Sequence, residues 1–403
     1  MTFEEIKQGE ETYIMHTYGR FPIALDHGKG ATLWDTDGKK YIDLTSGIGV
    51  NSLGHDNEAL TTAVSEQAHK LMHACNLYYT EPMVQAAKKL VDAAGMGKIF
   101  FANSGAEANE GMIKLARKYS FDKYGEGRNK IITLKQSFHG RTVTTLKATG
   151  QEKFHQYFFP FTEGFDYAAA NDIEAMKRKI DDTTCAVMME CIQGEAGVQP
   201  LGADYVKFVR ELCDINHALL IIDEVQTGIG RTGKWFAFQR DDLSGGVTPD
   251  MVTFAKGVAG GFPMGGMIAF GEKLAALFTP GSHGSTFAGN PLGAAAGLAT
   301  LGVIEDENLV ANAEARGEQL RDGIMATGNP LFVSVRGRGL LDAVELKHPC
   351  SHAVMNYCLE HGLIVNAVAP NALRFAPPLI VTAQDVDQAL AILKDVPTDL
   401  PDD

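Results

Sequence analysis

Continuous apolar runs recur at intervals through the middle of the chain. They cover residues 99–102, 131–134, 186–189, 219–222, 252–255 and 266–270. Most are flanked by helix-like stretches such as residues 107–119, 173–180 and 205–215. A strand without a polar side must be buried on both faces, so apolar runs that alternate with helices predict a mostly parallel sheet covered by helices. The pattern therefore indicates an α/β protein.

The two ends of the chain have a different pattern. Residues 32–35 and 40–44 alternate around a turn, which predicts a small region of hairpins. An Ala-rich helical stretch at 293–306 precedes short strand-like segments near 332–336, 340–346, 363–366 and 372–375. We expect residues 1–55 to contribute to a small domain, 56–290 to form a large domain, and 291–403 to complete the small α+β domain.

Composition and charge exclude several classes of protein. With 403 residues, 45% of them hydrophobic and 21% charged, the chain is typical of soluble globular proteins. The formal net charge of −14 disfavours nonspecific binding to nucleic acid or anionic membrane. Glu4 and Glu5 stand where a signal peptide would be basic, and no apolar run approaches the roughly 18 residues of a membrane span. The six cysteines contain no Cys-x-x-Cys pair, so we expect free thiols and a cytoplasmic location.

Candidate chemistry lies where two predicted strands end. Lys256 follows the run 252–255 and precedes a glycine, and Asp223 follows the run 219–222. Ligands of α/β proteins bind at the carboxyl ends of such strands. Pyridoxal phosphate requires this pair of groups, because an amine binds it covalently and a carboxylate keeps its pyridine nitrogen protonated. A lysine at a strand end is more often a surface residue, so the interpretation depends on further elements.

Two further segments follow predicted strands and add those elements. Residues 103–107 begin a helix, and the free amides and dipole of a helix start favour a phosphate dianion. Phe138 could stack on a cofactor ring, and Arg141 could hold a carboxylate with two hydrogen bonds. Taken singly, these features are also compatible with an ordinary helix cap, a core aromatic residue and a surface ion pair.

Nucleotide and metal motifs in the chain are incomplete. Residues 228–233 fit Gly-x-Gly-x-x-Gly, but the preceding strand ends several residues earlier. The same segment approaches a P-loop, but Trp235 stands where magnesium coordination requires Ser or Thr. His69 and His73 are one helical turn apart, without a third ligand or an adjacent catalytic Glu. We therefore expect neither a nucleotide cofactor nor a metal.

Taken together, six segments resemble the class III pyridoxal-phosphate-dependent aminotransferases. They are residues 103–107, 138–141, 193–195, 223–226, 256–257 and 285–291, in the family's order over nearly the whole chain. Within that class, the chain is most similar to the acetylornithine aminotransferases at residues 28–34, 53–55, 138–141, 283–286 and 374–377. The resemblance implies the fold type I of pyridoxal-phosphate transferases. It also implies a homodimer with shared sites that transfers the terminal amine of N2-acetyl-L-ornithine to 2-oxoglutarate in arginine biosynthesis.

The resemblance implies a role for each matching residue around the cofactor. Lys256 would bind the cofactor covalently and later move the substrate proton, while Asp223 would pair with the pyridine nitrogen. The other cofactor contacts would come from Ser104, Gly105 and Ala106 at the phosphate, Phe138 and Val225 on the ring faces, Gln226 near the ring hydroxyl, and Thr286 at the phosphate of the neighbouring subunit.

The resemblance also implies how one site serves two substrates. Arg141 would bind the substrate α-carboxylate, with Ser285 nearby. Glu195 and Arg374 would form a pair that opens for the second substrate.

The chain departs from the family pattern near this pair and at the pocket rim. Cys191 replaces the usual proline and Ala196 the usual glycine, so we expect the position of Glu195 to be less certain than that of the cofactor residues. Cys75 precedes Asn76 where serine is common.

Alternative functions share the same cofactor chemistry. Ornithine aminotransferases carry a tyrosine where this chain has Ile48, and loss of that polar contact disfavours a substrate with a free α-ammonium. Succinylornithine, 4-aminobutyrate and N-acyl-diaminopimelate or lysine-pathway compounds stay open as amine donors. An aminomutase is a further alternative, but Arg141 and the Glu195–Arg374 pair suit a two-substrate transaminase better. A non-enzymatic role is disfavoured because every residue that the chemistry needs is present.

Overall fold

A seven-stranded sheet forms the centre of the computed structural model, which describes all 403 residues. Its strands, in spatial order, are β4 (Lys98–Ala102), β12 (Gly265–Ala269), β11 (Met251–Phe254), β10 (Leu219–Asp223), β7 (Thr184–Met189), β5 (Lys130–Leu134) and β6 (Phe165–Ala168). Only β12 runs antiparallel to its neighbours. The mostly parallel sheet predicted from the apolar runs is confirmed.

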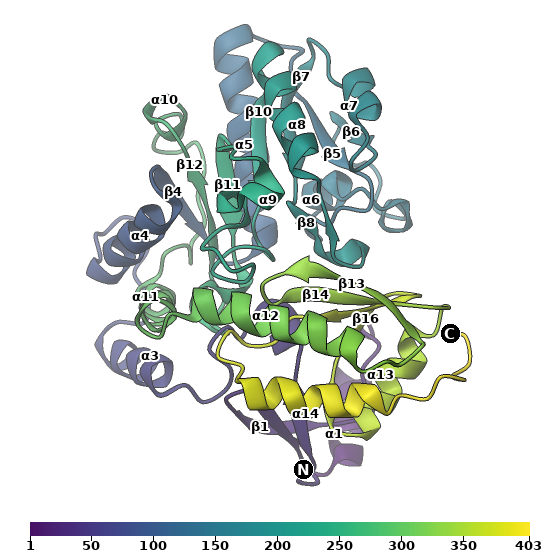
Figure 1. Ribbon diagram of the computed structural model, residues 1–403. Coiled ribbons are helices and arrows are strands. Elements are labelled where there is room, and N and C mark those ends of the chain that lie inside the picture. Colours follow the sequence, from purple (N-terminus) through teal and green to yellow (C-terminus); the bar gives the residue numbers. More distant parts are fainter.

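Helices cover both faces of this sheet (Figure 1). They are α4 (Glu81–Ala94), α5 (Gly105–Tyr124), α7 (Ile173–Lys179) and α8 (Ala203–Ile215). Alternate residues of β10 point to opposite sides: Ile221 packs in the cluster that contains α5, whereas Leu220 and Ile222 pack in the cluster that contains α8. This two-sided burial explains why the strand sequences carry no polar face. None of the helices has the length and apolar character needed to cross a membrane.

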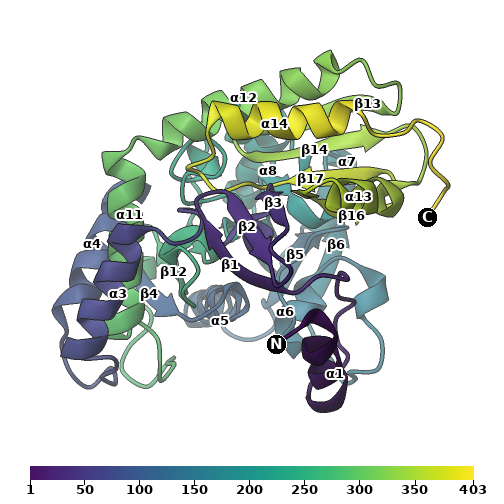
Figure 2. The same cartoon turned by 90° about the horizontal axis from the view of Figure 1, so that it is seen from below.

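The two ends of the chain meet in a second group of sheets and helices (Figures 1 and 2). One sheet contains β1 (Leu25–Lys29), β2 (Thr32–Asp35), β3 (Lys40–Asp43) and β15 (Leu363–Ile364), and another contains β13 (Phe332–Arg338), β14 (Leu341–Leu346), β17 (Ala372–Phe375) and β16 (Asn366–Ala369). The helices packed beside these sheets are α12 (Leu309–Ala326), α13 (Ser351–Glu360) and α14 (Ala383–Lys394), whereas α11 (Pro291–Asp306) leads into α12 and packs against α4. Because β3 pairs with β15, we propose that residues 1–55 belong with 291–403 in one small domain.

The remaining elements are short or lie at the edges of these layers. The helices are α1 (Phe3–Tyr13), α2 (Ser46–Gly49), α3 (Glu58–Lys70), α6 (Val143–Ala148), α9 (Asp241–Ser244) and α10 (Glu272–Ala275), and the strands are β8 (Ile192–Gln193) and β9 (Gln199–Pro200).

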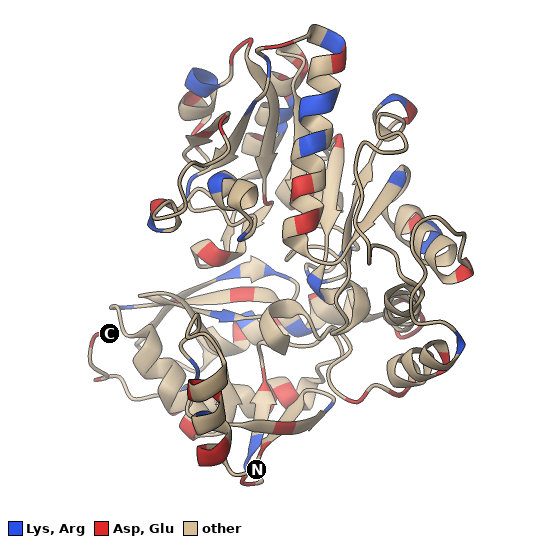
Figure 3. Ribbon diagram, turned by 180° about the vertical axis from the view of Figure 1, so that it is seen from behind, with Lys and Arg blue, Asp and Glu red and all other residues tan.

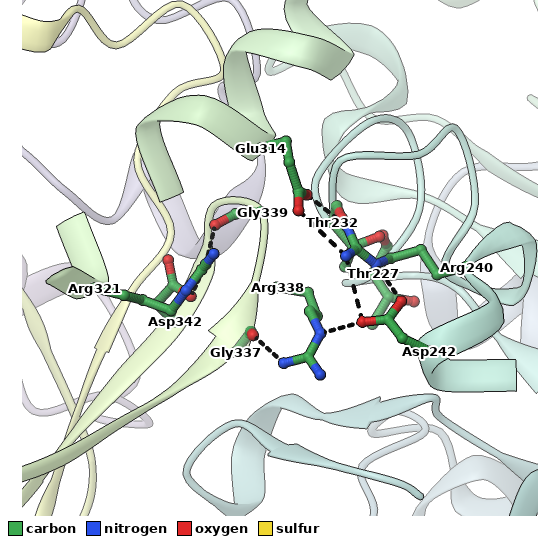
Figure 4. A network of polar contacts seen from close by, with 10 residues as sticks. All are labelled: Thr227, Thr232, Arg240, Asp242, Glu314, Arg321, Gly337, Arg338, Gly339 and Asp342. Carbon is green, nitrogen blue, oxygen red and sulfur yellow. Dashed lines mark hydrogen bonds and ion pairs between the residues drawn. The ribbon is translucent and has the colours of Figure 1, made fainter. Parts of the chain in front are cut away.

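A polar network joins the loop after β10 to the C-terminal elements (Figure 4). Arg240 binds the Glu314 carboxylate of α12 and the Thr232 carbonyl. Arg338 of β13 binds Asp242 of α9. Because this loop begins beside Asp223, the network ties one wall of the cavity described below to the C-terminal elements.

Candidate active site

A cavity of about 420 Å³ lies at the carboxyl ends of the central strands. Most of the candidate residues line it, and they come from loops far apart in the sequence. These residues are Ser104, Gly105, Ala106, Phe138, Arg141, Glu195, Asp223, Val225, Gln226 and Lys256. The fold therefore gathers in one place the groups that the sequence pattern singles out.

Asp223 is held at the end of β10 by four hydrogen-bond donors. Its Oδ2 accepts from Asn109 Nδ2 and His139 Nδ1, each at 2.8 Å. Its Oδ1 accepts from the Val225 amide at 3.0 Å and from Thr253 Oγ1 at 3.2 Å. The residue is only 3% exposed, so its orientation is fixed by the surrounding protein.

The surroundings of Asp223 keep its carboxylate ionised. Burial alone raises the pKa of Asp223, but the hydrogen bond and charge of His139 and the other donors outweigh it, and the pKa is lowered. Burial likewise lowers the pKa of His139, and Asp223 reverses that effect, so the imidazole pKa is raised. The two shifts share one cause, the hydrogen bond between the His139 imidazole and the Asp223 carboxylate, and both favour the ionised form of Asp223.

Lys256 follows β11 and begins a short 3₁₀ turn. Its φ of +45° lies in the left-handed region, which costs a non-glycine residue about 1–3 kcal/mol and is often found at functional sites. The Nζ atom makes no hydrogen bond or ion pair with the protein. Burial and the charge of Arg374 lower the pKa of Lys256, against the opposing effect of Glu195 and Asp223. The neutral, nucleophilic form of this amine is therefore more accessible than in an exposed lysine.

The first turn of α5 offers an anion site beside Asp223. Ser104 caps the helix by accepting the Glu107 amide at 3.2 Å, while the amides of Gly105 and Ala106 have no acceptor within the chain. A Cβ atom on Gly105 would lie 2.7 Å from Val225 Cγ1, so only glycine fits between the helix start and the valine. Unpaired amides and the positive end of the helix dipole fit a phosphate group.

Glu195 separates Arg374 from the cavity. Its Oε1 pairs with Arg374 Nη1 and accepts from Gln226 Nε2 at 3.3 Å. Arg374 is 2% exposed and does not line the cavity; its Nη2 donates to Asn366 Oδ1 at 2.7 Å. Burial raises the pKa of Glu195, but the charge of Arg374 dominates and lowers it. The pairing forms although Cys191 and Ala196 replace the family's usual residues.

Arg141 is exposed and lies over aromatic rings. Its guanidinium carbon is 4.1 Å from the Phe154 ring centroid and 5.7 Å from that of Phe138. No carboxylate of the chain pairs with it, so the guanidinium is available to an anionic group in the cavity. Such stacking leaves the hydrogen-bonding edge of the guanidinium free.

Ser285, Thr286 and Ile48 lie outside the cavity of the single chain. Ser285 Oγ accepts from Asn103 Nδ2 at 3.0 Å. Thr286 and Ile48 are exposed. The single chain therefore does not use these three side chains to line its own cavity.

The sequence profile described as "Aminotransferase class-III" matches residues 13–396. The chain belongs to the class III aminotransferase family. It is 68% identical to the acetylornithine aminotransferase of Bifidobacterium longum over 96% of this chain and 94% of that protein. Among solved structures, it is similar to the N-acetylornithine aminotransferase of Stenotrophomonas maltophilia, with a TM-score of 0.82 and 36% identity over 96% of this chain and 97% of the other. It is also similar to the ornithine aminotransferase of Toxoplasma gondii, with a TM-score of 0.92 and 30% identity over 98% and 95% of the two chains.

The fold alone does not identify the amine donor of this class III aminotransferase, because structures named for two different donors match it closely. The 68% identity to the Bifidobacterium longum protein is well above the 30% identity to the Toxoplasma gondii protein.

Three buried polar residues of the site were not singled out from the sequence. They are Asn109 and His139, which hold Asp223, and Glu190, which accepts the Phe138 amide at 3.2 Å. Asn109 is a polar residue on the apolar side of α5, and this position in the sequence pattern could have identified it as a site residue. His139 stands between Phe138 and Arg141, in a segment that follows a predicted strand and matches the family pattern, so its position can be predicted from the sequence.

Proposed function

We propose that this aminotransferase transfers the terminal amine of N2-acetyl-L-ornithine to 2-oxoglutarate and uses pyridoxal 5'-phosphate as cofactor. The products are N-acetyl-L-glutamate 5-semialdehyde and L-glutamate, as in arginine biosynthesis. The observation that carries this proposal is the shared cavity of the Lys256 amine and the Asp223 carboxylate. The 68% identity to an acetylornithine aminotransferase supports the choice of amine donor.

The residues present fit pyridoxal phosphate. Asp223 would face its pyridine nitrogen, Phe138 and Val225 its ring, and Gln226 its hydroxyl group. The phosphate would lie at Ser104, Gly105 and Ala106, where amides are unpaired. When bound, pyridoxal phosphate supplies an aldehyde for the amine and a cationic ring that withdraws electrons.

The neutral amine of Lys256 would then move the proton at the reacting carbon. Its lowered pKa favours the form that accepts a proton, and its flexible chain lets it deliver that proton to a neighbouring atom. Asp223 supports this step by remaining ionised, because its negative charge stabilises a protonated pyridine nitrogen.

Two arginines would distinguish the substrates. In N2-acetyl-L-ornithine the α-carboxylate is far from the reacting amine, and Arg141 would bind it at the rim of the cavity. Glutamate reacts at its α-amine and needs a cation closer to the centre. Arg374 would supply that cation after Glu195 moves aside, because its hydrogen-bond partners Glu195 and Gln226 both line the cavity.

We further propose a cytoplasmic homodimer with shared sites. The exposed Thr286 would serve the phosphate of the neighbouring subunit, and Ser285 would lie near the substrate in the assembled site. This proposal accounts for their position outside the cavity of their own chain.

Steady-state assays test the proposed reaction. Purified protein should use acetylornithine with a higher kcat/KM than succinylornithine, ornithine or 4-aminobutyrate, with 2-oxoglutarate as acceptor. Lys256→Ala should fold and bind the cofactor noncovalently but should not turn over, whereas the exposed-lysine control Lys207→Ala should match the parent. A preference for another donor would replace acetylornithine in the proposal, and normal turnover by Lys256→Ala would remove its basis.

A further inference from the structure

A second cavity, of about 710 Å³, adjoins the active-site cavity. It is lined by residues of the large part of the molecule (residues 56–290), including Lys147 of α6 and residues 150–153, and by residues of the C-terminal part (291–403), including Ala369 of β16. Glu195 lines both cavities. We call this second space the antechamber.

The antechamber carries lysines without carboxylate partners. Lys135, Lys147 and Lys153 line it, and none forms an ion pair. Lys147 Nζ lies 5.6 Å from the Tyr167 ring centroid, and Lys153 Nζ lies 5.0 Å from that of Phe154. Neither contact cancels a positive charge.

The acidic groups of the antechamber only partly balance these lysines. Glu195 is already paired with Arg374, and Glu152 is exposed and forms no ion pair. Three lysines without a carboxylate partner and one unpaired glutamate therefore line the antechamber. By contrast, Lys118, Lys130 and Lys179 elsewhere on the large part each pair with an aspartate.

This local charge opposes that of the whole molecule. The chain has a formal net charge of −14, and its acidic and basic residues are scattered over both parts (Figure 3). A dianion approaching from solution is repelled by the molecule as a whole but is attracted by a cationic hollow beside the site, because clefts lined by one sign of charge concentrate the opposite ion.

The two substrates of the proposed reaction differ in charge. 2-Oxoglutarate carries two carboxylates. Acetylornithine carries one carboxylate and one ammonium group and is neutral overall. A cationic antechamber therefore attracts the first substrate and acts weakly on the second.

We propose that the antechamber is an electrostatic collecting site for the dicarboxylate amino acceptor, and that Lys135, Lys147 and Lys153 supply its charge. The inference rests on the proposed function for the identity of that acceptor. Phe154 is the physical link to the active site: Arg141 lies over its ring in the cavity, and Lys153 lies over the same ring in the antechamber. A dianion at the lysines is thus one side chain away from the residues of the active site.

The test separates the two half reactions. Lys135→Gln, Lys147→Gln and Lys153→Gln are combined, and the amine form of the enzyme, prepared with pyridoxamine phosphate, is mixed with 2-oxoglutarate in a stopped-flow instrument. The apparent second-order rate constant should fall about tenfold, which is the lower end of reported steering effects. The acetylornithine half reaction should change by less than about twofold, because a neutral substrate gains little from steering.

Two matched variants control for net charge and for folding. Lys207→Gln, Lys273→Gln and Lys394→Gln change three exposed, unpaired lysines elsewhere and should retain the parent rate constants. Lys135→Arg, Lys147→Arg and Lys153→Arg, combined in one variant, keep the charge and should retain most of the steering.

Ionic strength gives an independent measurement. The rate constant of the parent with 2-oxoglutarate should fall as salt rises from about 0.01 M to about 0.15 M, where the Debye length shrinks from about 30 Å to about 8 Å. The glutamine variant should show a flatter dependence. Binding of glutarate, an unreactive dianion, measured by calorimetry should follow the same pattern.

Unchanged 2-oxoglutarate kinetics and salt dependence in the glutamine variant would overturn the inference. An equal loss in both half reactions would overturn it as well, because the lysines would then support the site generally. Failure of the proposed function would give a different result. The parent would then not accept the amine of acetylornithine at all. The reaction with 2-oxoglutarate is measured without that donor and can still be tested.

Discussion

Asp223 and Glu195 are two carboxylates on the same cavity, and the protein holds them in opposite ways. Asp223 is fixed by four donors that all belong to the large part, and it is 3% exposed. The Glu195 side chain is 33% exposed, and its main partner, Arg374, comes from β17 in the C-terminal part. Asp223 is therefore held in one position, whereas Glu195 has a partner that it can exchange.

The difference follows from what each side must do in the proposed reaction. The charge opposite the cofactor ring must stay in place in both half reactions, so removal of its partners should be costly. The Glu195 carboxylate must neutralise Arg374 when acetylornithine is bound and leave Arg374 when glutamate is bound. Exposure to the cavity lets Glu195 leave its partner without being buried alone.

The largest effect should come from Asp223→Asn, which keeps the side-chain volume and removes the charge. Proton removal from the substrate should slow by about 10³-fold or more, equivalent to about 4 kcal/mol. The reason is that a neutral pyridine withdraws electrons poorly. Single-turnover kinetics at equal cofactor content measure the step. A loss below about tenfold, or 1.4 kcal/mol, would show that the locked carboxylate is not essential.

Arg141→Ala should have the next largest effect. Loss of a charged contact with the distant α-carboxylate should cost about 2–5 kcal/mol in the acetylornithine half reaction. The glutamate half reaction should be affected much less, because that substrate reacts at its α-amine. The two half reactions are measured separately, with Arg178→Ala as a control on an arginine outside the cavity. Equal losses would mean that Arg141 supports the site as a whole.

Glu190 extends the comparison to a carboxylate that forms no ion pair. Burial, together with the charges of Asp223 and Glu195, raises the pKa of Glu190 to about 7, although His139 acts in the opposite direction. The folded state thus holds a proton that the unfolded state has lost. Stability is full below the ordinary pKa of 4.5 and falls as the pH rises towards 7.

Glu190→Gln should remove this loss of stability at high pH. From the pKa shift, the variant should be more stable than the parent by at most about 3 kcal/mol at pH 8, with no gain near pH 4. The amide oxygen of glutamine can still accept the Phe138 amide. Unfolding temperatures measured across this pH range provide the comparison. A stability difference that does not vary with pH would mean that folding does not change the pKa of Glu190.

The positions of Asp223 and Lys256 were more predictable from the sequence than the pairing of Glu195 with Arg374. The apolar runs predicted β10 and β11, and the parallel pairing of these strands brings Asp223 opposite Thr253, close to Lys256. The pairs that hold the carboxylates depend on contacts between distant segments, such as Asn109 with Asp223. Local periodicity carries no information about such contacts, and the same reason applies to the pairing of β3 with β15 across more than 300 residues.

The smallest effect, and the most direct test of exchange, should come from Glu195→Ala. Without Glu195, Arg374 would face the cavity for both substrates. Affinity for glutamate and 2-oxoglutarate should rise, and the preference for acetylornithine should weaken, because a free cation near the centre stabilises an α-carboxylate there. We expect the ratio of acetylornithine to glutamate efficiency to fall about tenfold, or 1.4 kcal/mol.

Glu195→Gln separates the charge from the contact. Glutamine can still accept a hydrogen bond from Arg374 but no longer neutralises it, so the ratio should fall to a value between those of the parent and Glu195→Ala. Pre-steady-state measurement of both half reactions gives the ratio for each protein. If all three ratios agree, Glu195 does not exchange partners during the reaction. The neighbouring departures from the family, Cys191 and Ala196, would then be the first substitutions to reverse. The fully buried Cys191 precedes the 3₁₀ turn Gly194–Ala196 that carries Glu195, and the small Ala196 ends that turn.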